Sequence, residues 1–185
     1  MGELKAAIEN RRSIRKYKEE QVPREMLEEV LRMGMLAPSA SNRQPWHFVA
    51  IQDRELIQEW NDAIIDQMAK HGNDANKKTA ASGNYNPLFG APTLILVCGV
   101  ADSNWSANDC GLASENMSLA AYDMELGSCM IGFARLVPVY GEYPALVEKS
   151  KIPLGYEIKY GFLLGYPDEE PAMRARDFEK VTYIG

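Results

Sequence analysis

In the first 34 positions, apolar side chains recur every three or four residues, the spacing of helices that bury one face. A short first helix is expected over the apolar stripe of residues 4–8 and runs into Arg11. A second helix is expected to start at Pro23, since proline suits the first turn of a helix, and to end near Gly34. Residues 38–45, with two prolines among polar residues, are then expected to form a rigid loop.

The middle of the chain combines strand patterns with one helical stripe. His47 to Gln52 predicts a strand, and Asp53 is placed to cap a helix whose apolar stripe reaches Met68. Residues 71–90 have no periodicity and are expected to form a long loop, which in a compact domain is usually functional or mobile. The apolar run 93–100 predicts a strand buried on both faces.

The C-terminal half predicts a long helix and two further strands. Residues 108–126 form the longest helical pattern, and they are apolar or small around most of the circumference. Such a helix is buried on more than one side, which in a small protein suggests contact with a second subunit. Strands are expected over 128–133 and 157–165, with a weaker helix over 140–149 and strand character in the tail at 181–184. The pattern therefore predicts a mixed sheet covered by helices.

Composition places the chain among ordinary globular proteins. Its 185 residues, 46% hydrophobic and 25% charged, suit one domain over residues 1–185. No stretch approaches the roughly 20 apolar residues of a membrane helix, and no signal-peptide pattern opens the sequence, so a cytoplasmic location is expected. Three widely spaced cysteines and two histidines match neither a disulfide framework nor a metal site, and no metal is expected.

The charge distribution is uneven. The net charge is −6, yet five cations are crowded into residues 11–18. A local cationic cluster in an acidic chain favours a specific anion site, whereas nucleic-acid binding normally requires a broad basic face. A basic-arm nucleic-acid binder is the weaker alternative and predicts salt-sensitive affinity.

Arginines in two distant segments are candidates for binding a phosphate. Arg11, Arg12, Ser13 and Arg15 combine guanidinium groups and a hydroxyl at the end of the first helix. The alternative is a solvated basic helix end, which the helix dipole favours. Arg174 and Arg176 are two apart in an extended segment, so both side chains can reach one anion.

Two further segments have the composition of a surface for a planar ligand. The loop from Pro38 to Trp46 offers short hydrogen-bonding side chains on a stiff backbone, although such side chains can equally satisfy the loop's own backbone. Residues 127–133 contain small residues that let a main chain approach a flat ring and donate backbone N–H groups. Cys129 in this segment is expected to be a packing residue rather than a nucleophile.

In four sequence blocks the chain resembles the nitroreductase family. The blocks follow the family's order and extend from Glu9 to Arg176. They read Arg-Arg-Ser-Ile-Arg-Lys-Tyr from Arg11, Ala-Pro-Ser-Ala-Ser-Asn-Arg-Gln-Pro-Trp from Ala37, Asp-Cys-Gly-Leu-Ala-Ser-Glu-Asn-Met from Asp109, and Leu-Gly-Ser-Cys-Met-Ile-Gly from Leu126.

The resemblance implies an α+β homodimer with a mixed, mainly antiparallel sheet and FMN bound between subunits. It also implies that helix 108–126 forms the dimer core and that the tail reaches the partner. The residues it assigns to the phosphate and ribityl chain are Arg11, Ser13 and Arg15, with Arg12 nearby and Arg174 and Arg176 from the tail. Those assigned to the partner-facing loop are Pro38, Ser39, Ser41, Asn42 and Gln44, and those along the flavin ring are Met130, Ile131 and Gly132.

The implied function is an FMN-dependent oxidoreductase that passes hydride from NADH or NADPH to a small acceptor such as a nitroaromatic or a quinone. Because the flavin carries the chemistry, no side chain is named as catalytic. A specialised flavin enzyme, such as a reductive dehalogenase or a flavin-fragmenting enzyme, and a non-catalytic FMN-binding module for redox sensing or flavin storage are the alternatives. Tyr85, Asn86 and Phe89 are either an aromatic lid or an ordinary surface loop.

Overall fold

The computed structural model describes residues 3–185 and contains one four-stranded sheet. Its strands are β1 (Trp46–Ile51), β2 (Thr93–Val100), β3 (Gly127–Ile131) and β4 (Tyr156–Gly165). They lie in the order β1-β2-β4-β3, and each neighbouring pair is antiparallel. The sheet flanked by helices is confirmed; it was expected to be mixed and mainly antiparallel, and every pair of neighbouring strands is antiparallel. The predicted strand bounds hold to within one or two residues.

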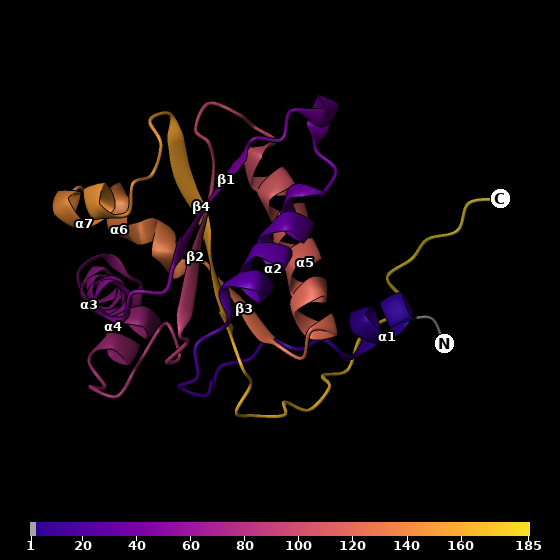
Figure 1. Ribbon diagram of the computed structural model, residues 1–185, viewed down its shortest axis with the longest axis horizontal. Coiled ribbons are helices and arrows are strands. Elements are labelled where there is room, and N and C mark those ends of the chain that lie inside the picture. Colours follow the sequence, from indigo (N-terminus) through magenta and orange to yellow (C-terminus); the bar gives the residue numbers. More distant parts are fainter. Residues whose placement is uncertain (1–2) are drawn as a thin grey trace.

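Helices cover both faces of this sheet (Figure 1). On one face lie α2 (Arg24–Met35) and α5 (Ser106–Asp123), with α1 (Glu3–Asn10) beside the end of α5. The opposite face is covered by α3 (Arg54–His71), α4 (Asp74–Ala80), α6 (Leu136–Val139) and α7 (Pro144–Lys149). Two short 3-10 turns, η1 (Ala40–Asn42) and η2 (Phe133–Arg135), complete the described elements. The chain therefore forms three layers, with a helical layer on each side of the sheet.

Strand β2 divides the core into two halves. Leu94 and Leu96 pack into the cluster under α3, whereas Ile95 and Val97 pack into the cluster under α2 and α5. This alternation confirms that the apolar run 93–100 is a strand buried on both faces. The same strand pairs with both β1 and β4, and β4 in turn pairs with β3.

A side-chain cap fixes the start of α3, and a glycine allows α2 to pack closely on α5. The Asp53 carboxylate accepts a hydrogen bond from the Leu56 backbone N–H at 2.9 Å, which is the expected N-cap. Gly34 lies against α5, where an added Cβ would stand 2.7 Å from Met117 Cγ. The absence of a side chain at Gly34 therefore lets the two helices approach closely.

Three expectations from the sequence need correction. Residues 74–80 form helix α4 inside the segment that was expected to be a loop. The expected helix over 140–149 is shorter, with α7 beginning at Pro144 and a separate turn, α6, before it. The tail after β4 forms an isolated bridge at Pro167 but no regular strand within the described residues.

Across residues 3–185, no helix combines the length and apolar composition needed to cross a bilayer.

Large apolar side chains remain exposed on the layer formed by α1, α2 and α5. Leu4 is 66% exposed, Ile8 is 58% exposed and Leu36 is 64% exposed. Leu4 and Leu36 border a groove of about 270 Å³ that lies between α1, the end of α2 and α5. The C-terminal tail adds further exposed apolar side chains, namely Phe178, Val181, Tyr183 and Ile184.

An ionic cluster ties the end of α3 to the connection between α6 and α7. The Glu142 carboxylate accepts hydrogen bonds from Lys70 Nζ at 2.8 Å and from Gln67 Nε2 at 3.1 Å. Its other oxygen lies 2.9 Å from His71 Nε2, and the His71 ring stacks on Tyr140. The hydrogen bonds from Lys70 and His71 lower the pKa of Glu142 from its ordinary value of 4.5 to about 2.

This cluster gives a pH-dependent prediction. A carboxylate whose pKa falls on folding stabilises the native state above its unfolded pKa, and that stability is lost as pH falls through the folded pKa. We therefore expect Glu142→Gln to lower the melting temperature at pH 7, and the difference from the parent to shrink between about pH 4.5 and pH 2. Thermal unfolding followed by circular dichroism measures this. Glu148→Gln, at an exposed position of α7, is the control; an equal, pH-independent loss in both variants would contradict the assignment.

Candidate functional site

The cationic segment Arg11–Lys18 is joined to the edge of the sheet. Ser13 forms a parallel bridge with Ser128 of β3, and the Ile14 N–H donates to the Ser128 carbonyl at 2.9 Å. Gly127 makes this approach possible, because a Cβ there would lie 2.8 Å from Ile14 Cγ1. The glycine in the sequence block from Leu126 therefore brings the cations against β3.

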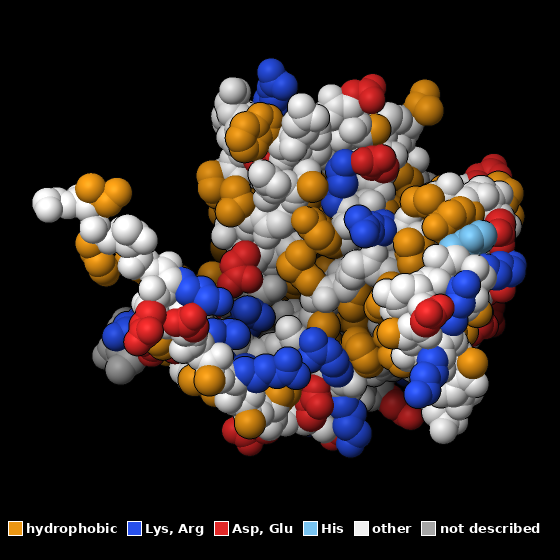
Figure 2. Space-filling model, turned by 180° about the vertical axis from the view of Figure 1, so that it is seen from behind, with side chains coloured by type: hydrophobic (Ala, Val, Ile, Leu, Met, Phe, Trp, Pro, Cys, Tyr) orange, Lys and Arg blue, Asp and Glu red, His pale blue; other side chains and the backbone are white. Residues whose placement is uncertain are grey.

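The start of the C-terminal tail holds the same segment from the other side. The Lys18 N–H donates to the Tyr166 carbonyl and the Asp168 N–H donates to the Lys16 carbonyl, both at 2.9 Å. The Arg15 N–H donates to the Glu169 carboxylate. Residues 11–18 thus lie between β3 and the tail, and their backbone is fixed by both. Figure 2 shows Lys and Arg side chains gathered along the lower part of the molecule, from the base of the tail inward.

The arginines of this segment differ in how free their guanidinium groups are. Arg11 is half-buried; its Nε lies 3.6 Å from a Glu115 carboxylate oxygen and has no hydrogen-bond partner within residues 3–185. Arg12 Nη1 donates to the carbonyls of Glu9 and Arg11 at 2.8 Å, so it turns back onto the end of α1. Arg15 is exposed and donates one long hydrogen bond, 3.4 Å, to the Ser13 carbonyl. Arg11 and Arg15 therefore have guanidinium N–H groups available to a ligand.

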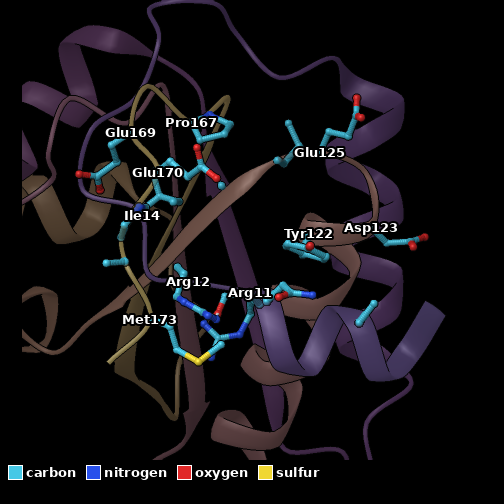
Figure 3. Close-up of a pocket in the computed structure, with 16 residues that line it drawn as sticks. Arg11, Arg12, Ile14, Tyr122, Asp123, Glu125, Pro167, Glu169, Glu170 and Met173 are labelled. Atoms are coloured by element: carbon cyan, nitrogen blue, oxygen red, sulfur yellow. The ribbon is translucent and has the colours of Figure 1, made fainter. Parts of the chain in front are cut away.

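A cavity of about 910 Å³ opens beside Arg11 and Arg12 (Figure 3). Its walls come from α1, the end of α5, the start of β3 and tail residues between 167 and 173. Acidic side chains share these walls with the two arginines, namely Asp123, Glu125, Glu169 and Glu170. Arg174 and Arg176 follow Met173, a wall residue, but both are exposed and neither lines the cavity in the described chain.

The residues predicted to lie along a flat ring are at the other end of β3. Met130 is 37% exposed, Ile131 is buried, and Gly132 lies on the open surface just after the strand. Burial raises the pKa of the Cys129 thiol, which agrees with packing rather than nucleophilic chemistry. None of residues 130–132 borders the cavity, within the part of the chain that the structure describes.

The segment that was expected to be either a lid or a surface loop lies beside Arg15. The Arg15 guanidinium carbon is 6.0 Å from the centre of the Phe89 ring, and Tyr85 meets Phe89 edge to face at 6.5 Å. Both aromatic side chains pack against the core cluster that contains Ile14 and Cys129. The aromatic pair therefore borders the cationic segment rather than standing in solvent.

The polar loop from Pro38 to Gln44 lies far from the cationic segment in a single chain. In Figure 1 the loop projects at the top of the molecule, whereas residues 11–18 run along the bottom. Its hydroxyl and amide groups serve the loop itself: Ser39 Oγ accepts from the Gln44 N–H at 2.9 Å, and Gln44 Nε2 donates to Asn42 Oδ1 at 3.1 Å. One chain thus brings together the cations, the start of β3 and the aromatic pair, but not this loop.

Two contact residues were not singled out from the sequence. Glu169 holds the Arg15 backbone, and Asp109 accepts a hydrogen bond from the Ala40 N–H at 3.1 Å. The sequence signals that point to them are the acidic turn before Pro171 and an aspartate near the start of a helix that is largely apolar or small.

Both the sequence and the fold match those of known proteins. A sequence model described as the nitroreductase family matches residues 8–166. A protein of Archaeoglobus fulgidus, provisionally named NADH dehydrogenase/NAD(P)H nitroreductase, is 34% identical over 178 residues, covering 92% of this chain and 88% of the relative. The crystal structure of a nitroreductase with bound FMN from Bacteroides fragilis matches with a TM-score of 0.91 and 28% identity, covering 100% of both chains. A second FMN-bound nitroreductase structure, from Desulfitobacterium hafniense, has a TM-score of 0.89 and 26% identity over 100% of both chains.

Proposed function

Because this chain belongs to the nitroreductase family, we propose that it is an FMN-dependent oxidoreductase that passes hydride from NADH or NADPH to a small acceptor such as a nitroaromatic or a quinone. The observation that carries this proposal is the cationic segment 11–18, which is fixed against the edge of β3. The NAD(P)H nitroreductase name of the A. fulgidus relative and the FMN in the B. fragilis structure support the donor and the cofactor.

The donors present fit the phosphate and ribityl chain of FMN. Arg11 has a buried Nε without a hydrogen-bond partner in the described chain, and a phosphate oxygen would satisfy it. The exposed Arg15 guanidinium and the Ser13 hydroxyl lie on the same short segment. In this proposal Arg12 adds positive charge nearby, and Arg174 and Arg176 complete the phosphate site from the tail.

The flavin ring is proposed to lie across the end of β3. Met130, Ile131 and Gly132 would supply a close main-chain surface with backbone N–H donors, and the open space around Gly132 leaves room for a ring. When bound, the flavin supplies the hydride chemistry, so the residues of this chain have only to bind and orient it. The aromatic pair Tyr85 and Phe89 then borders the ring site beside Arg15.

A second copy of the chain completes the proposed site. The loop Pro38–Gln44 lies far from segment 11–18 within one subunit, so it reaches a flavin only when it belongs to a partner. Its Pro38, Ser39, Ser41, Asn42 and Gln44 would then face the partner's flavin. The exposed apolar layer of α1, α2 and α5 supplies a surface for a homodimer, and the apolar tail supplies an arm that extends across it.

The whole chain is proposed to be one domain. A cytoplasmic location is also proposed, and the three free cysteine thiols are consistent with it.

Visible absorption spectroscopy under anaerobic conditions tests the function. We expect the purified protein to carry FMN, and NADH or NADPH to bleach the oxidised flavin band. Admission of a quinone or nitroaromatic should then restore it. A flavin that neither nucleotide reduces would instead favour a non-catalytic FMN-binding module, and a protein that takes up no FMN would contradict the proposal.

A further inference from the structure

A buried carboxylate lies beneath the polar loop. Asp109 is 4% exposed and stands in the first turn of α5, within the layer on which the loop rests. Its Oδ1 accepts a hydrogen bond from the Ala40 N–H at 3.1 Å. Ala40 opens the turn η1, so this contact ties the start of the turn to the long central helix.

The loop that Asp109 holds has an unfavourable backbone conformation. Ser41, Asn42 and Gln44 all have positive φ, at 52°, 52° and 49°, although none of them is glycine. Such conformations persist only where surrounding contacts impose them, and they are concentrated at binding sites. Within the loop, the Asn42 N–H donates to the Ser39 carbonyl and the Gln44 N–H donates to Ser39 Oγ, both at 2.9 Å. These bonds shape the loop internally but do not orient it relative to the body of the protein.

Asp109 supplies that orientation. Burying a carboxylate is costly unless it is hydrogen-bonded or near positive charge, and the N-terminal turn of α5 provides positive dipole charge for it. A charged acceptor also forms a stronger hydrogen bond to a backbone N–H than a neutral one does. The carboxylate is thus suited to hold one peptide group of the loop at a fixed place on α5.

We propose that Asp109 is a positioning residue that fixes the loop Pro38–Gln44 in its flavin-facing conformation, and that it therefore acts on the flavin bound by the partner subunit. This inference rests on the proposed function, because the loop is assigned to the partner's flavin there. Asp109 itself does not touch the flavin. Its influence passes through the Ala40 peptide to the side chains of the loop.

Replacing Asp109 with alanine tests this role in the intact dimer. We expect Asp109→Ala to raise the dissociation constant of FMN about tenfold and to shift the absorption spectrum and midpoint potential of the bound flavin, because the loop no longer keeps its place. Asp109→Asn keeps an oxygen that can accept from Ala40 and is expected to restore most of the affinity. Asn104→Ala, at an exposed position in the turn just before α5, is the matched control and should leave FMN binding unchanged.

Hydrogen exchange of the FMN-free protein gives a readout that does not depend on flavin. Asp109→Ala should speed exchange at Ala40 and Asn42 relative to the parent, while the strand amides stay protected. Unchanged exchange in the loop would overturn the positioning role even if FMN binding fell. If Asp109→Ala speeds exchange in the loop but the parent protein binds no FMN, the contact between Asp109 and the loop is supported. The effect on flavin is then overturned, together with the proposed function. An Asp109→Asn variant as weak as Asp109→Ala, with equally fast exchange, would also contradict the proposal.

Discussion

Replacing Arg15 with alanine is expected to weaken FMN binding about 10- to 100-fold while the protein stays folded, because a charge-assisted hydrogen bond is worth roughly 1.5–3 kcal/mol. The Arg15 guanidinium is exposed in the free chain and makes one long hydrogen bond to the Ser13 carbonyl. Its removal therefore costs the fold little, and the effect should appear in ligand binding. Titration of the FMN-free protein with FMN, followed by the quenching of flavin fluorescence, measures the change.

Arg24→Ala is the matched control for this substitution. Arg24 is also exposed, but its Nε donates to the Glu28 carboxylate at 2.6 Å on the surface of α2. It should bind FMN as the parent does. If Arg15→Ala retained the parent's affinity, the assignment of segment 11–18 to the phosphate and ribityl chain would be wrong.

The second large effect is expected from Leu36→Arg, which should convert the proposed dimer into monomers and abolish tight FMN binding. Leu36 is already exposed in a single chain, so arginine there should fold normally as a monomer. In a dimer, however, the same position would place an unpaired charge against apolar side chains, which costs several kcal/mol per interface. A symmetric dimer interface contains the substitution twice, so the effect is doubled. Sedimentation velocity over a concentration series measures the state of assembly.

Leu154→Arg serves as the control, because Leu154 is fully exposed in the turn before β4 rather than on the layer of α1, α2 and α5. Leu154→Arg should remain dimeric and retain bound FMN. A parent protein that sediments as a monomer with FMN bound would remove the need for a partner's loop and would contradict the proposed site.

The sequence predicted the fold well where one-sided or uninterrupted apolar patterns reflect burial. The run from Thr93 to Val100 predicted the central strand because its first seven residues are buried, and the side chains from Leu94 to Cys98 alternate between the two core clusters. The cap at Asp53 marked the start of α3 for a local reason, a side-chain bond to a nearby backbone N–H. Both signals depend on residues close together in the chain.

Helix α4 shows why the segment 71–90 was misread. It buries no side chain, so it has no apolar stripe to reveal it. Its start is fixed by Asn73, whose side chain accepts from the Asn76 N–H at 2.9 Å, and its residues contact α3. A capped polar helix held by its neighbour has almost no periodic signal in sequence.

The candidate site was predicted block by block, but its assembly was not. The basic segment and the strand at 127–133 were both singled out, yet nothing local shows that Gly127 lets Ile14 pack against it. The residue pattern likewise gives no distance between the polar loop and the cations within one chain; only the family resemblance assigned that loop to the partner subunit. Contacts between residues far apart in sequence depend on the whole fold, which motifs alone do not encode.

The clamping of segment 11–18 has a consequence for the order of events during biosynthesis. Ser13 needs Ser128 as its partner, and Tyr17 needs Pro167, so the N-terminal cations are held in place only after the last strand has been made and paired. Contacts between such distant residues form late, because closing long loops costs chain entropy before any contact rewards it. A nascent chain on the ribosome should therefore have no affinity for flavin. FMN would bind after the chain leaves the ribosome, when the complete subunit first holds segment 11–18 in place.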